Sequence, residues 1–205
     1  MAARFDVVAW SKVILWLLLL WPAGSLLLAG LQDRLGPDPA KALVDASGLW
    51  ALRCLLLSLC MSPLRRWTGR SWWLRYRRLL GLFALFYACL HVLAYVFLLF
   101  GAQWRELAEE LLRRPYVMVG GMAFLILLLM GLTSTRGWQR RLAGRWGQLH
   151  RLVYAALLLV LLHYLWVQKL GWQVVWPYAM AAVLLLGMRL WWKIRQSRSW
   201  RVNSR

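Results

Sequence analysis

The sequence predicts an all-α fold, a polytopic membrane bundle of six transmembrane helices. Three observations predict it: 62% of the 205 residues are hydrophobic, only 16% are charged, and the apolar residues form long blocks. Ordinary soluble domains hold about 45–50% apolar and about 25% charged residues. A soluble protein of this size could not bury such blocks, so the expected surroundings are a lipid bilayer.

Six apolar segments come close to the roughly 20 residues that a helix needs to cross a bilayer core. They run near residues 10–31, 47–63, 79–100, 115–132, 149–168 and 173–192. A basic tail at 193–205 follows the last segment, and no internal repeat stands out. The first block exceeds the h-region of a typical signal peptide, so we expect a retained helix. Residues 1–205 are therefore expected to form a single membrane domain.

The net charge of +19 lies mainly between the apolar blocks. With loops assigned alternately to two sides, one side carries 19 Lys and Arg residues and the other carries 7. Because cytoplasmic loops are the positive ones, both termini are expected in the cytoplasm. No soluble basic domain is evident, so the charge does not indicate nucleic-acid binding.

Three histidines, His91, His150 and His163, are the main functional candidates, since ionisable groups inside a membrane span are costly. Each taken singly could also serve an interhelical hydrogen bond. Counted from the cytoplasmic side at 1.5 Å per residue, His91 lies about 18 Å deep and His163 about 21 Å deep. Two imidazoles at one level can clamp a haem between helices.

His150 differs from this pair because it lies at the cytoplasmic edge. It precedes His163 by 13 residues, which puts the two side chains about 140° apart on an ideal helix. Either the helix is distorted or the two histidines serve different neighbours.

Other chemistries fit the residues less well. Zinc would require Cys or carboxylate companions, and a cation transporter usually carries an acidic residue within its spans. There is no Gly-rich phosphate loop after a strand, so no module that binds NADPH is recognisable, and electrons, if the protein carries them, must come from another molecule. A small membrane transporter without a cofactor stays open as the alternative from another functional class.

The sequence resembles the MsrQ (formerly YedZ) family within the ferric-reductase-like transmembrane group. The similarity covers about residues 40–192. The matching stretches are Arg77-Arg78-Leu79-Leu80-Gly81-Leu82, Leu90-His91 with Tyr95, Arg114-Pro115-Tyr116, Leu132-Thr133-Ser134-Thr135, Arg145-Trp146, Gln148-Leu149-His150, Val153-Tyr154 and His163-Tyr164-Leu165-Trp166.

The resemblance implies a multi-pass protein of the bacterial inner membrane that carries haem b, one or two per chain, and is associated with FMN. Such a subunit is not an enzyme on its own. It passes electrons from quinol or a cytosolic flavin reductase to a periplasmic molybdopterin methionine sulfoxide reductase, MsrP, for protein repair. A stand-alone cytochrome-type quinol or ferric reductase is the alternative within this class.

The resemblance also implies roles for individual residues. His91 and His163 are the preferred pair of haem iron ligands, and His150 is a second or inner-site ligand. The third-helix position where the wider group carries an inner histidine is Arg77, which leaves the haem count open. Four arginines near the inner site could contact haem propionates or a flavin phosphate, or merely anchor helix ends; they are Arg77, Arg78, Arg140 and Arg141.

Overall fold

The computed structural model describes residues 2–168 and 171–203. Within these ranges the chain is helical and contains no strand. Six helical spans are long and apolar enough to cross a membrane, which confirms the predicted fold class. They are built from α1 (Ala2–Leu31), α2 (Pro39–Thr68), α3 (Trp73–Leu93) with a π-helical extension η1 (Ala94–Leu99), α5 (Pro115–Leu132), α8 (Val153–Val167) together with the helical residues 144–152 before it, and α9 (Trp172–Asn203).

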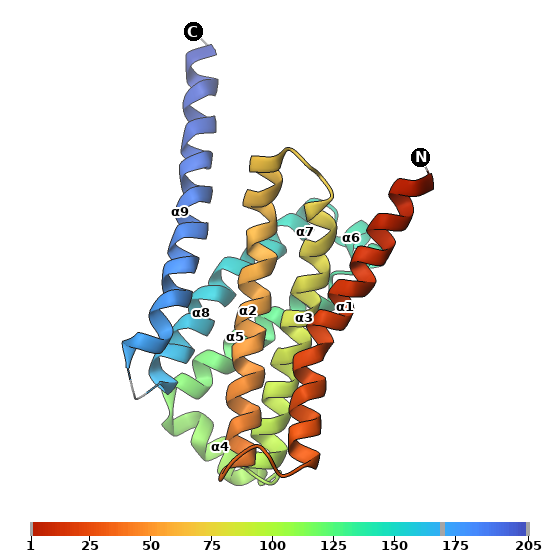
Figure 1. Ribbon diagram of the computed structural model, residues 1–205. Helices are drawn as coiled ribbons and strands as arrows, with labels where there is room; N and C mark the ends of the chain where they lie inside the picture. Colours follow the sequence, from red (N-terminus) through yellow and green to blue (C-terminus); the bar gives the residue numbers. More distant parts are fainter. Residues whose placement is uncertain (1, 169–170, 204–205) are drawn as a thin grey trace.

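Short helices connect some of these spans. α4 (Trp104–Arg113) lies between η1 and α5. α6 (Arg136–Leu142), α7 (Gly144–Leu149) and the single 3₁₀ turn η2 (His150–Leu152) lead from α5 into α8. Figure 1 shows both chain termini at one end of the bundle, here called the terminal end, and α4 at the opposite end, here called the α4 end.

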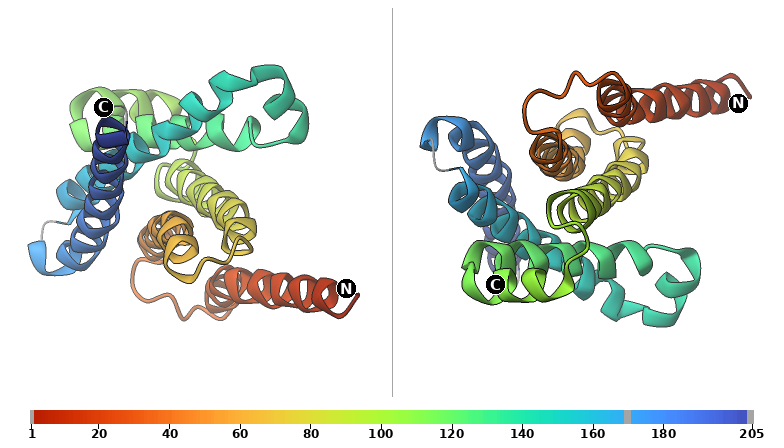
Figure 2. Two further views of the ribbon diagram at one scale, coloured as in Figure 1. Left: turned by 90° about the horizontal axis from the view of Figure 1, so that it is seen from above. Right: turned by 90° about the horizontal axis from the view of Figure 1, so that it is seen from below.

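Two helix pairs form the centre of the bundle. α2 packs along α3, α5 packs along α8, and α3 joins the pairs by packing on α5. α1 and α9 lie at the outside, as the views along the bundle show (Figure 2). The buried Tyr87 hydroxyl donates a 2.6 Å hydrogen bond to the Leu19 carbonyl, which ties α1 to α3. This arrangement leaves one face of α3 and one face of α8 turned toward each other.

The predicted second segment, 47–63, is too short, because α2 spans Pro39–Thr68. The side chain of Asp38 accepts a 2.9 Å hydrogen bond from the Lys41 backbone N–H, and Pro39 occupies the first turn. Gly69 ends the helix with a φ of 67°, which glycine adopts without strain. The charged residues in the first and last turns lower the local hydropathy, so hydropathy alone hides these turns.

The last helix is also longer than predicted. The sequence suggested a span at 173–192 and a separate basic tail, but α9 continues without a break to Asn203. Residues 188–203 contain neither Gly nor Pro, and their Arg, Lys and Gln side chains favour helix. Most of the basic tail is therefore a continuation of the span, while residues 204 and 205 lie outside the described part.

Candidate functional site

His91 on α3 and His163 on α8 face each other between the two central helix pairs. Their ring centroids are 6.1 Å apart and their planes are nearly perpendicular, at 86°. Imidazole binds a metal with a bond of about 2 Å, so two axial imidazoles have centroids about 6 Å apart. The spacing fits one metal ion between the rings. The structure thus brings together the two histidines that the sequence places at one level.

A backbone carbonyl orients each ring. His91 Nδ1 lies 2.8 Å from the Val44 carbonyl oxygen, and His163 Nδ1 lies 2.7 Å from the Tyr116 carbonyl oxygen. A carbonyl only accepts, so each ring donates from Nδ1 and keeps its lone pair on Nε2. Metal-binding histidines characteristically have this arrangement, in which the second ring nitrogen donates to a carbonyl or carboxylate. Both imidazoles are therefore oriented as ligands.

Two glycines make room for the rings. A Cβ atom on Gly48 would lie 2.8 Å from His91 Nδ1, and one on Gly120 would lie 2.7 Å from His163 Nδ1. Real Cβ atoms do not approach so closely. Each glycine lies one helical turn after the residue whose carbonyl holds the ring. Glycine at these positions allows α2 and α5 to approach the histidines.

The two halves of the site are equivalent in sequence spacing. In both halves the histidine follows the carbonyl residue by 47 positions. Val44, Gly48 and His91 are each followed after 72 residues by their counterparts, Tyr116, Gly120 and His163. This equivalence concerns three site positions in each half. The glycine and the histidine recur in type as well as in spacing, whereas Val44 corresponds to Tyr116.

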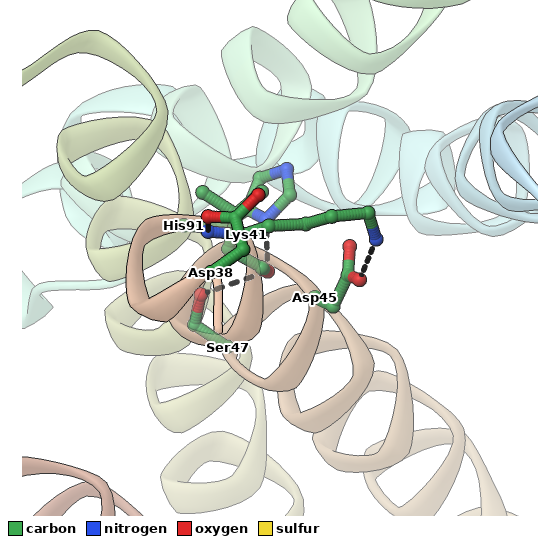
Figure 3. A network of polar contacts seen from close by, with 6 residues as sticks. Asp38, Lys41, Asp45, Ser47 and His91 are labelled. Carbon is green, nitrogen blue, oxygen red and sulfur yellow. Dashed lines mark hydrogen bonds and ion pairs between the residues drawn. The ribbon is translucent and has the colours of Figure 1, made fainter. Parts of the chain in front are cut away.

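The histidine pair lies near the α4 end. Val44 is in the second turn of α2, and Tyr116 is the second residue of α5. Figure 3 shows His91 against the start of α2, where the Val44 carbonyl also accepts a 3.1 Å hydrogen bond from the Ser47 hydroxyl. An ion pair between Lys41 and Asp45 lies beside it.

The chain around Tyr116 links the site to the surface of the α4 end. The Tyr116 ring centroid lies 6.3 Å from that of His163. Its hydroxyl accepts a 2.6 Å hydrogen bond from Arg114, which raises the pKa of that guanidinium. Arg114 also forms an ion pair with Glu110 on α4, at 2.6 Å. Polar side chains therefore lead from the exterior to the carbonyl that holds His163.

His150 does not join this pair. It stacks on Trp146, with ring centroids 4.0 Å apart, and its Nδ1 lies 3.3 Å from the Trp146 carbonyl oxygen. The 13 positions to His163 correspond to about 20 Å along a helix. His150 begins the 3₁₀ turn η2, so the helix is distorted between the two histidines, one of the two outcomes that the spacing allowed.

The four predicted anion-binding arginines separate into two groups. Arg77 is half-buried, 3.4 Å from the Ser62 hydroxyl, and it interacts electrostatically with His150. Arg78, Arg140 and Arg141 are exposed. The structure therefore brings only Arg77 toward the interior of the bundle at the terminal end.

Two further arginines were not predicted as site residues, because the charge count assigned them to loops. Arg53 lies inside α2, and its Nε donates a 3.2 Å hydrogen bond to the Tyr178 hydroxyl. Arg189 lies inside α9, and one terminal nitrogen donates to the Leu59 carbonyl at 2.7 Å. Their positions within apolar segments were the signal that could have identified them.

Within the described ranges, no three His, Cys, Asp or Glu side chains gather closely enough to hold a metal ion. The His91–His163 pair could thus supply two protein ligands to a metal. A metal bound there would need its remaining positions filled by a cofactor. Haem, which supplies four equatorial nitrogens and accepts two axial histidines, has this requirement.

Comparison with known proteins agrees with this geometry. Residues 47–161 match the family described as ferric reductase like transmembrane component. The chain is 43% identical over 179 residues to the protein-methionine-sulfoxide reductase heme-binding subunit MsrQ of Xanthomonas euvesicatoria pv. vesicatoria (strain 85-10), covering 87% of this chain and 79% of the relative.

A second relative with the same description, from Xanthomonas axonopodis pv. citri (strain 306), is 44% identical over 174 residues, or 85% of this chain and 77% of the relative. No solved structure matches the chain. The six spans and these relatives indicate a multi-pass bacterial membrane protein. The chain belongs to the MsrQ family of heme-binding subunits, within the ferric-reductase-like transmembrane group.

Proposed function

We propose that the chain binds haem b between His91 and His163 and carries electrons across the bacterial inner membrane. One observation supports this most strongly: two imidazoles 6.1 Å apart, each donating from Nδ1 to a backbone carbonyl. Bound haem would supply one-electron chemistry. The chain's own residues orient the ligands, and the apolar bundle around them excludes water.

The resemblance and the relatives' names favour a periplasmic partner. Those relatives are named as subunits of a protein-methionine-sulfoxide reductase. We infer that this chain, as a single membrane domain, delivers electrons to an MsrP-like molybdopterin subunit that reduces oxidised methionine. The chain itself performs no sulfoxide chemistry. Its donor would be quinol or a cytosolic flavin reductase, and FMN would be a second cofactor.

The positive-inside rule supports the direction of this transfer. With both termini in the cytoplasm, the α4 end faces the periplasm and the histidine pair lies close to that face. Electrons would enter near the terminal end, where His150 could ligate an inner haem. In this role Arg77, Arg78, Arg140 and Arg141 would contact propionates or a flavin phosphate.

The haem ligands can be tested on the purified full-length chain. A Soret band that shifts on dithionite reduction is expected, whereas a transporter without a cofactor would be colourless. His91→Ala and His163→Ala should each lose the haem of this pair, as measured by the haem-to-protein ratio. His150→Ala is the matched control and should keep it. A wild-type chain that stays colourless when expressed with ample haem would contradict the proposal.

The partner can be tested in cells. Deleting the periplasmic reductase should abolish repair of methionine sulfoxide that depends on this chain. The alternative is a stand-alone cytochrome-type quinol or ferric reductase, and the match to the ferric reductase like family is compatible with it. In that case, electron flow through the chain should continue unchanged after the deletion.

A further inference from the structure

Arg189 has an unusual environment inside α9. One of its terminal nitrogens donates to the Tyr154 hydroxyl and the other to the Leu59 carbonyl. Its Nε is buried and has no hydrogen-bond partner among the described residues. A buried donor without an acceptor is costly, and the cost is larger on a charged group. The side chain is therefore held in place by neutral acceptors, and no ion pair to it is found among the described residues.

A second guanidinium lies close by. Arg77 on α3 interacts electrostatically with both Arg189 and Tyr154. Its one described side-chain hydrogen bond is the long contact to Ser62. Two positive groups thus face the same part of the bundle, and their mutual repulsion adds to the cost of burial.

No carboxylate of the described part offsets these charges. The four ion pairs found in residues 2–168 and 171–203 involve Asp45, Glu109 and Glu110, all at the α4 end. Only one of the seven acidic residues, Asp6, precedes residue 33 or follows residue 110; its side chain lies outside the description. In folded proteins, a buried positive side chain is usually paired with a group of opposite charge.

We propose that Arg189, together with Tyr154 and Arg77, forms a binding site for an anionic oxygen group at the terminal end of the bundle. Arginine suits a carboxylate or phosphate because its planar fork of donors matches both groups. The Tyr154 hydroxyl accepts from Arg189, so its own proton is available to donate. Three donors from α3, α8 and α9 would then converge on one anion.

Two ligands could present this chemistry, a haem propionate or the phosphate of FMN. The site is separate from the His91–His163 pair, and either ligand would extend the proposed electron path toward the terminal end. The inference rests on the proposed function only in the choice of these two ligands. Both can be tested while the haem of the histidine pair serves as an internal measure of correct folding.

The experiment compares ligands that differ only in the anionic group. Flavin-free full-length protein in detergent is titrated with FMN and with riboflavin. Cofactor-free protein is reconstituted with haem and with haem dimethyl ester. The variants are Arg189→Gln and Tyr154→Phe. Arg195→Gln, which alters an exposed arginine stacked over Trp191 on the same helix, is the control.

We expect the wild type to prefer the anionic form of one ligand by about tenfold or more, the ratio that about 1.4 kcal/mol produces. Arg189→Gln should remove this preference and Tyr154→Phe should weaken it, whereas Arg195→Gln should leave it unchanged. A lost preference for FMN over riboflavin identifies a phosphate. A lost preference for haem over its ester in a second haem equivalent identifies a propionate.

The proposal is overturned if the wild type shows neither preference, or if Arg189→Gln and Tyr154→Phe both leave the preference intact. If Arg189→Gln also loses the haem of the histidine pair, the milder Tyr154→Phe decides, because it keeps the ring and its packing. An unchanged preference in that variant then counts against the site. His91→Ala should lose the haem of the histidine pair but should still give the wild-type result in the FMN titration. The anion site can therefore be tested separately from the proposed function.

Discussion

The two ends of the bundle handle charge in opposite ways. All four ion pairs found among the described residues lie at the α4 end, where neutral backbone carbonyls hold the two imidazoles. At the terminal end, Arg77 and Arg189 lie within the helices without a described acidic partner. The α4 end thus pairs acidic with basic side chains within the chain, and it holds the two imidazoles that we propose as metal ligands. At the terminal end no such ion pair is found among the described residues, which is why we propose that an external anion binds there.

The largest effect is expected at the α4 end, where Gly120 leaves room for the His163 ring. Gly120→Ala places a methyl group against the His163 ring, and overpacking of this kind costs about 1–3 kcal/mol. The ring must shift away from the ligand position, so haem retention should fall by about tenfold or more. The haem-to-protein ratio after purification measures this loss.

The adjacent Gly121 is a matched control, because a Cβ atom there would meet nothing within 4 Å. Gly121→Ala should keep full haem, and a slight gain in stability is expected from its better helix propensity. Equal haem loss in both variants would mean that the glycine at 120 serves general helix packing rather than the ring.

A smaller effect is expected from giving the terminal end its own counterion. Cys60 on α2 lies within electrostatic range of Arg189. Cys60→Asp should place a carboxylate near the guanidinium and compete with an external anion. The affinity for the anionic ligand should fall by about tenfold, or about 1.4 kcal/mol. Titration with FMN or haem measures the change.

Cys60→Asn is the isosteric control for this substitution, because it introduces a polar side chain without charge. It should leave the preference for the anionic ligand close to that of the wild type. If Asn and Asp reduce the affinity equally, the loss arises from packing, and the contrast between the two ends is weakened.

The smallest effect is expected for the exposed ion pair at the α4 end. Lys41 and Asp45 are both solvent-accessible, and such pairs contribute about 0.2–1 kcal/mol or nothing measurable. Lys41→Gln should therefore change the thermal midpoint by only a small amount and leave haem content unaltered. A large loss of haem would show that this pair supports His91 directly.

Much of the fold was predictable, because the mean hydropathy of a window of residues detects membrane-spanning helices without knowledge of the tertiary structure. The six spans follow from the apolar blocks. The extra turns of α2 and α9 could not be predicted from these blocks, because charged residues can continue a helix beyond the bilayer. The capping residues at 38 and 39 marked the true start of α2, but a hydropathy window does not weigh them.

The site was predictable in part. The depth of His91 and His163 follows from counting residues along two helices. The partners of the rings could not be found in this way, because backbone carbonyls at residues 44 and 116 have no side-chain signature. Arg189 was missed because a charge count assigns each residue to a loop, whereas a long side chain within a span can bond to neighbouring helices.

The use of backbone carbonyls to hold both imidazoles has a consequence for variation among sequences. Hydrogen bonding to an axial ligand is one of the means by which a protein sets the reduction potential of a haem. Here no side-chain substitution at residues 44 or 116 can delete the acceptor, because every amino acid carries the same carbonyl. Valine and tyrosine therefore both serve as acceptors here, and the hydrogen bond that orients each imidazole does not depend on the type of side chain at its position.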